Sequence, residues 1–222
     1  MDKGDSIQDL VRFSRMLYDR GLVHAEGGNT SIRSGGEASP GGEVWITRTG
    51  SVLGRLAEED LTRMTLDGQV IAGDKPSKEW PMHLAIYKAR PDARAIIHIH
   101  PTYAIAHSTL LAEPTLDAVP AYTSALYRRA GRVPMIDYYP VGSKDLHEAI
   151  AALAPHFYAI LMKQHGVTVA SSSLSKAFGI IEEIEQCCHI ALLTGGRGMP
   201  LADEERDVID ALQGRTWPEG IA

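Results

Sequence analysis

The stretch Ala95–Pro101 constrains the fold more than any other part of this sequence. It reads Ala-Ile-Ile-His-Ile-His-Pro, and its run of β-branched residues favours a strand. Strand side chains alternate between faces with a rise of about 3.3 Å per residue, so His98 and His100 are expected on one face, roughly 7 Å apart. The opposite face is apolar, and the proline ends the strand. The stretch therefore predicts a strand that is core on one side and a candidate site on the other.

Two further residues favour a metal site over an ordinary polar strand face. His165 lies between the apolar runs 158–162 and 167–170, at a break between two expected strands. Glu79 lies at the start of an amphipathic helix expected over 80–89, where it could also simply complement the helix dipole. Three neutral imidazoles and one carboxylate suit Zn²⁺, Mn²⁺ or another divalent ion. The other six histidines, His83 among them, have no such context and are interpreted as structural or exposed.

Composition narrows the class of protein. The chain has 222 residues, 44% hydrophobic and 23% charged, which suits one α/β domain spanning 1–222. A net charge of −6 argues against nucleic acid or an anionic membrane surface as the main partner. Cys187 and Cys188 are adjacent and are expected as buried thiols of a reducing compartment, and no apolar run is long enough for a signal peptide or a membrane span. We expect a cytoplasmic enzyme.

Local patterns give the remaining elements. Two segments rich in glycine and hydroxyl groups, 26–31 and 49–51, are interpreted either as turns or as anion cradles. A glycine-rich loop is expected over 34–42 and a tail over 215–222. Helices are expected over 7–20, 80–89 with Ser77 as N-cap, 102–111, 144–153, 175–193 and 203–212. Strands are expected over 44–47, 61–71 as a hairpin, 95–100, 119–125, 133–139 and on both sides of His165.

Five motifs together resemble the class II aldolase/adducin family. They are Gly28-Asn29-Thr30-Ser31, Thr49-Gly50-Ser51, Pro76-Ser77-Lys78-Glu79, His98-Ile99-His100 and Gln164-His165-Gly166, and they occur in the family's order over about residues 7–207. Any one motif is weak evidence, whereas five in register are specific. The resemblance implies a three-layer αβα fold with a mostly antiparallel central sheet. It also implies a homotetramer with its sites between subunits.

The same resemblance assigns roles to individual residues. His98, His100 and His165 match the family's metal ligands, usually for Zn²⁺, and Glu79 matches an acid/base carboxylate that also touches the metal. Tyr122 matches a tyrosine that reaches into a neighbouring site. The positions that hold a substrate phosphate match Asn29, Thr49, Gly50 and Ser77, and Lys78 is added to them on its charge and position.

Departures from the family pattern rank the possible reactions. Fuculose-phosphate aldolases carry a second serine where this chain has Lys78, and a catalytic tail tyrosine, whereas no tyrosine follows Tyr158 here. The run 73–79 is more similar to the 3-oxo-tetronate 4-phosphate decarboxylases. Decarboxylation of a small phosphorylated sugar acid therefore ranks first and aldol cleavage of a phosphorylated ketose second. Epimerisation ranks third because the epimerases carry Asp where this chain has Glu79, and a non-catalytic adducin-like interaction module is the remaining alternative.

The family's reactions share one chemical difficulty. Cleavage of a carbon–carbon bond beside a carbonyl leaves a high-energy enediolate, which a divalent cation stabilises as a Lewis acid. Protonation then completes the reaction, and Glu79 or Tyr122 is the expected donor. A carboxyl group can take that role only if its pKa is raised.

Overall fold

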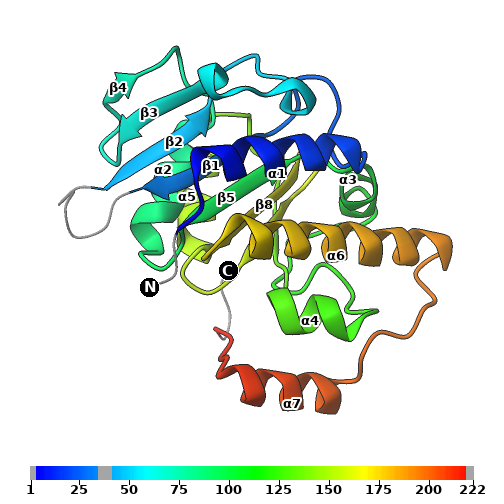
Figure 1. The fold of residues 1–222 in the computed structure, drawn as a ribbon. Coiled ribbons are helices and arrows are strands. Elements are labelled where there is room, and N and C mark those ends of the chain that lie inside the picture. Colours follow the sequence, from blue (N-terminus) through cyan, green and yellow to red (C-terminus); the bar gives the residue numbers. More distant parts are fainter. Residues whose placement is uncertain (1–3, 35–41, 219–222) are drawn as a thin grey trace.

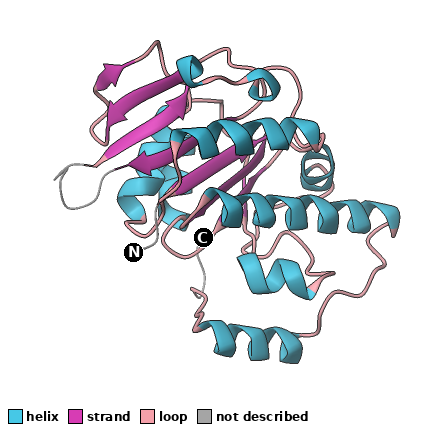
Figure 2. Ribbon diagram, in the orientation of Figure 1, coloured by secondary structure: helices cyan, strands magenta, loops and turns pink. Residues whose placement is uncertain are grey.

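A computed structural model describes residues 4–34 and 42–218. Parts of the loop expected over 34–42 and of the tail expected over 215–222 lie outside these residues. An eight-stranded sheet runs through the molecule in the order β4-β3-β2-β1-β5-β8-β7-β6 (Figures 1 and 2). Its strands are β1 Asn29–Ser34, β2 Glu43–Thr47, β3 Leu61–Thr65, β4 Val70–Ala72, β5 Ala95–Ile99, β6 Met135–Ile136, β7 Ala159–Met162 and β8 Gly166–Ser171.

Helices cover both faces of the sheet, and two hydrophobic cores lie between the layers. One core packs beneath α1 (Ile7–Asp19), α3 (Thr102–Ser108), α4 (Ser124–Ala130) and α6 (Leu174–Leu193). The other packs beneath α2 (Trp80–Ala89) and α5 (Lys144–Leu153). The remaining helical segments are η1 (Leu53–Arg55), η2 (Glu58–Asp60) and α7 (Asp203–Gln213), and α7 packs against α4 (Figure 1).

The expected fold class is confirmed. Strand β6 pairs with β7 in parallel, and every other neighbouring pair of described strands is antiparallel. Along β5 the alternation is as expected, because Ile97 and Ile99 belong to one core while Ile96 and His98 face the opposite layer. None of the described helices is both long and apolar enough to cross a membrane.

Local rules account for several boundaries. Ser6 caps α1 by accepting a hydrogen bond from the Asp9 amide, and the Asp9 carboxylate accepts one from the Ser6 amide. Ser143 caps α5 in the expected place. The expected cap of α2 is wrong: Glu79 occupies the N-cap position, and the Ser77 hydroxyl accepts a hydrogen bond from the Glu79 amide just before the helix.

Three other expectations differ from the structure in the middle of the chain. In place of the strand expected over 119–125, residues 119–123 form a loop and α4 begins at Ser124, with Thr123 as N-cap accepting a hydrogen bond from the Leu126 amide. The strand expected over 133–139 shortens to the two residues of β6. The helix expected over 102–111 ends at Ser108. Both cysteines are buried and free, as expected.

Candidate metal centre

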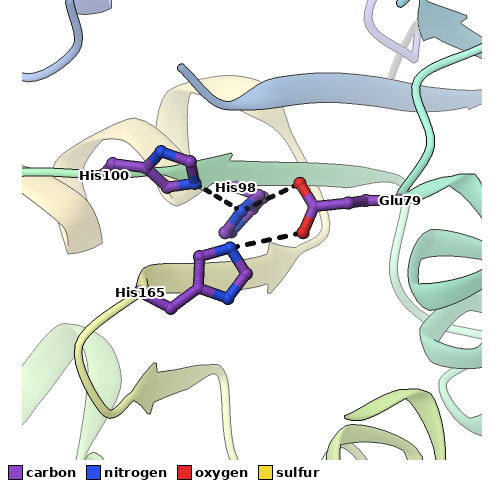
Figure 3. Close-up of side chains that lie close together, drawn as sticks. All are labelled: Glu79, His98, His100 and His165. Carbon is purple, nitrogen blue, oxygen red and sulfur yellow. Dashed lines mark hydrogen bonds and ion pairs between the residues drawn. The ribbon is translucent and has the colours of Figure 1, made fainter. Parts of the chain in front are cut away.

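Four side chains from three separate parts of the chain converge on one point. Ligand atoms of Glu79, His98, His100 and His165 all lie within 4.8 Å of one another (Figure 3). His98 belongs to β5 and His100 follows it, while His165 lies in the turn between β7 and β8. Glu79 stands at the start of α2. Antiparallel pairing of Ile99 with Val167 brings the turn beside the end of β5.

The backbone and its hydrogen bonds fix the orientation of the histidines. The Nδ1–H of His98 donates to the carbonyl oxygen of Val167 at 3.1 Å, which leaves the Nε2 lone pair facing the other ligands. His165 follows Gln164, which has a φ of 56°. A left-handed residue other than glycine costs about 1–3 kcal/mol and concentrates at functional sites. The turn therefore holds a strained backbone at the position that presents His165.

The atoms that face one another fit a cation between them. The Nε2 atoms of His98 and His100 are 3.0 Å apart, and the Glu79 carboxylate oxygens lie 3.2 Å from His98 Nε2 and 3.4 Å from His165 Nε2. Among the described residues, Glu79 Oε1 and both ring nitrogens of His165 are buried without a hydrogen-bond partner. Buried lone pairs left in this way are costly unless a cation binds them. Three imidazoles and a carboxylate form a donor set suited to a divalent transition metal.

Protonation states at this centre are those of a metal-binding site. Burial would raise the pKa of Glu79, but interactions with His98 and His165 outweigh burial and lower it. Burial, reinforced by the neighbouring His98 and His165, lowers the pKa of His100 to about 3. Glu79 is therefore ionised and His100 is neutral near neutral pH, which are the forms that bind metals.

A pocket of about 190 Å³ opens beside the centre. Glu79 and His100 line it together with all five residues that the sequence assigned to phosphate binding: Asn29, Thr49, Gly50, Ser77 and Lys78. Backbone hydrogen bonds from the Thr49 amide to Lys75 and from the Ser77 amide to Thr47 join the two loops. Two of the four candidate metal ligands thus share one pocket with the hydroxyl-rich segments.

Two features of this pocket were missed from the sequence. Arg48 lines it and pairs with Asp60, whose Oδ1 lies 2.7 Å from Arg48 Nη2. The position of Arg48 directly before Thr49-Gly50 could have identified it from the sequence as a pocket residue. Its pairing with Asp60 could not have been foreseen. The Asn29 side chain is already engaged, because its Nδ2 donates to Glu79 Oε2 at 2.8 Å.

Tyr122 lies elsewhere in this chain. It does not line the pocket, and its ring packs against the core of α6 beside Gly198. A Cβ added to Gly198 would lie 2.7 Å from the Tyr122 ring.

His83 on α2 should make the protein less stable in mild acid. It is fully buried, and burial lowers its pKa to about 3. Between that value and about 6.5 the unfolded chain binds a proton at this residue and the folded chain does not, so stability falls as pH falls, by at most about 1.4 kcal/mol per pH unit. Urea unfolding at pH 7, 6 and 5 measures this slope. We expect His83→Gln to flatten it, and equal slopes in the two proteins would contradict the assignment.

Comparison with known proteins agrees with this geometry. Residues 8–192 match the family model described as Class II Aldolase and Adducin N-terminal domain. A 3-oxo-tetronate 4-phosphate decarboxylase from Pectobacterium atrosepticum is 36% identical over 189 residues, covering 85% of this chain and 84% of that protein. An L-fuculose phosphate aldolase from Methanocaldococcus jannaschii is 35% identical over 193 residues, covering 87% of this chain and 97% of that protein.

Solved structures give the same result. YgbL from Escherichia coli superposes with a TM-score of 0.85 at 30% identity, covering 91% of this chain and 96% of that chain. An L-fuculose 1-phosphate aldolase superposes with a TM-score of 0.82 at 32% identity, covering 96% and 98% respectively. With the sequence motifs, the sheet and the Glu-His₃ cluster in agreement, this chain belongs to the class II aldolase and adducin family.

Proposed function

We propose that this protein is a divalent-metal-dependent lyase that decarboxylates 3-oxo-tetronate 4-phosphate. The observation that carries the proposal is the shared pocket, in which Glu79 and His100 of the Glu-His₃ cluster adjoin the hydroxyl-rich loops at Thr49 and Ser77. Such a pocket suits a small substrate with a phosphate at one end and a ketone at the other. The curated decarboxylases, 33–36% identical to this chain, support that reaction.

The phosphate-binding loops, Lys78 and the metal cluster have separate parts in the proposal. Thr49, Gly50 and Ser77 bind the phosphate, with Arg48 as an additional cation. Lys78 is exposed at the same pocket and orients the leaving carboxylate. His98, His100, His165 and Glu79 hold the metal, which we take to be Zn²⁺ or Mn²⁺. When bound, the cation supplies Lewis-acid stabilisation of the charge that develops at the carbonyl.

The proton donor follows from the electrostatics of the centre. The lowered pKa of Glu79 favours a carboxylate, which accepts protons and does not donate them. We therefore assign proton donation to Tyr122. Since its ring lies outside the pocket of its own chain, the proposal includes a homotetramer in which Tyr122 serves the site of a neighbouring subunit. The buried free cysteines suit a cytoplasmic location.

Aldol cleavage is the second candidate. It is favoured by relatives named L-fuculose phosphate aldolase, 31–35% identical to this chain. The sequence counts against it, because no tyrosine follows Tyr158 and Lys78 replaces a serine. A non-catalytic interaction module remains the last alternative, after epimerisation, since it would need neither the cluster nor the loops.

An assay on 3-oxo-tetronate 4-phosphate tests the proposal. We expect the zinc- or manganese-loaded protein to release CO₂ with formation of a phosphorylated hydroxyketone, and His98→Ala to lose this activity. Lys78→Ala should weaken turnover or substrate affinity, and unchanged kinetics would remove Lys78 from the mechanism. Absence of CO₂ release, with dihydroxyacetone phosphate formed from fuculose 1-phosphate or ribulose 1-phosphate, would assign the protein to the aldolases instead.

A further inference from the structure

A continuous chain of buried polar side chains runs behind the metal centre. Tyr87 Oη lies 2.9 Å from Ser31 Oγ, which lies 2.7 Å from His83 Nδ1. On the other side of the imidazole, His83 Nε2 lies 2.6 Å from Asn29 Oδ1, and Asn29 Nδ2 lies 2.8 Å from Glu79 Oε2. Tyr87, Ser31 and His83 are fully buried, and Asn29 and Glu79 are 3% and 6% exposed. Only Glu79 belongs to the four-residue cluster, so the other four residues of the chain lie outside the set of candidate metal ligands.

The spacing of two adjacent elements produces this chain. Helix α2 supplies His83 and Tyr87, with Glu79 at its N-cap, so the three lie four residues apart along one helical face. Strand β1 supplies Asn29 and Ser31, two residues apart on one strand face. Four residues of a helix advance about 6 Å and two residues of a strand advance about 6.6 Å. The side chains of the helix and those of the strand are therefore spaced almost equally, and each can contact the next.

The direction of the hydrogen bonds is determined by the carboxylate. The amide nitrogen of Asn29 donates to Glu79 Oε2, and the Asn29 oxygen therefore faces His83. That oxygen requires a proton on His83 Nε2, which leaves Nδ1 to accept from the Ser31 hydroxyl. Ser31 in turn accepts from Tyr87. Every donor in the chain therefore points toward Glu79.

We propose that His83 is a positioning residue, which acts through Asn29 to hold the Glu79 carboxylate in its metal-binding orientation. Asn29 binds Oε2 of that carboxylate, whereas Oε1 has no hydrogen-bond partner among the described residues and faces His165. Without a proton on His83 Nε2, the Asn29 amide could rotate and offer its oxygen to the carboxylate, and Glu79 would lose its fixed orientation. This inference rests on the proposed function only in taking Glu79 as a metal ligand.

A structural role alone makes a different prediction. Beside this chain, apolar side chains of α2 such as Met82 and Ile86 pack into the core, so helix packing does not rest on the polar chain alone. If His83 served packing only, its replacement would change stability and leave the affinity of the folded protein for metal unchanged. Outer partners of metal ligands, by contrast, typically contribute about 10–100-fold to metal affinity.

Binding of Co²⁺ to the metal-free protein separates these roles. We expect His83→Leu to bind Co²⁺ about 10–100-fold more weakly than the unmodified protein and to change the visible absorption of the bound ion. His83→Gln should recover most of the affinity, because its side-chain amide can still donate to Asn29 Oδ1. His83→Asn, which is polar but shorter, should not. If His83→Leu does not fold, the Co²⁺ affinities of His83→Gln and His83→Asn are compared instead, and equal affinities would contradict the inference.

Two further variants serve as controls. Leu84→Ala, a core change on the same helix, should lower thermal stability without weakening Co²⁺ binding to the folded protein. Tyr87→Phe removes only the far end of the chain and should have a smaller effect than His83→Leu.

The outcomes are distinct. Wild-type affinity and absorption in both His83→Leu and His83→Asn would overturn the inference, as would loss of binding in Leu84→Ala as large as that in His83→Leu. A wild-type protein that binds no Co²⁺ would also remove it, together with the metal centre. Binding without decarboxylase activity would overturn the proposed reaction and leave the role of His83 in place.

Discussion

Replacing His98 by alanine should remove tight binding of divalent metal and lower kcat/KM by more than about 100-fold. That is more than the loss of a residue that only hydrogen-bonds to a metal ligand, which lowers metal affinity or activity by about 10–100-fold. His98 is fully buried, and its Nε2 lies within 3.0 Å of His100 and 3.2 Å of Glu79. Its ring also has the fixed orientation given by the Val167 carbonyl. The variant keeps the other three ligands but leaves a gap in the middle of the set.

Metal content after dialysis, and competition with a chromogenic zinc chelator, measure this loss. The matched control is His156→Ala, because His156 is an exposed histidine just beyond α5. The control should keep wild-type metal content and activity. A His98→Ala protein that retains stoichiometric metal with unchanged affinity would show that the four side chains are not the metal centre.

The half of this centre that comes from β5 and the residue directly after it could be predicted from the sequence alone. Alternation along a strand places His98 and His100 on one face, and their Nε2 atoms are 3.0 Å apart. The turn that presents His165 was also recognisable from its two flanking apolar runs. Its place beside β5 was not, because the pairing of β5 with β8 is a contact between segments about 70 residues apart that no local pattern encodes. Only the resemblance to a family supplied that step.

The sequence did not predict the central strand β1, and the reason lies in its composition. The strand reads Asn-Thr-Ser-Ile-Arg-Ser, a composition that normally indicates a turn. Its hydroxyl and amide groups are nevertheless buried because each has a partner, such as Ser14 for Thr30 at 2.7 Å and His83 for Ser31. These partners lie on α1 and α2, far from β1 in the sequence. The polar residues of β1 can therefore be buried only through contacts that form when the chain folds.

The second large effect is expected at Gly28, directly before β1. Gly28→Ala should destabilise the fold by about 3 kcal/mol or more. Gly28 has a φ of 79°, and an added Cβ would lie 2.6 Å from the carbonyl oxygen of His98 and 3.0 Å from Ile99 Cα. The left-handed backbone alone costs an L-residue about 1–2 kcal/mol. The contact with backbone atoms of β5 adds to it, because neither strand can move without breaking the pairing of Asn29 with His98.

Gly21→Ala is the control that separates these two contributions. Gly21 has a φ of 71°, yet nothing lies within 4 Å of the Cβ that alanine would add. Its replacement should therefore cost only the backbone contribution of about 1–2 kcal/mol and leave metal affinity unchanged. Urea unfolding of both variants, with metal content measured alongside, compares them directly. Equal destabilisation would mean that β1 and β5 separate easily at this point, and the close approach of Gly28 to His98 would then have no part in positioning the metal ligand.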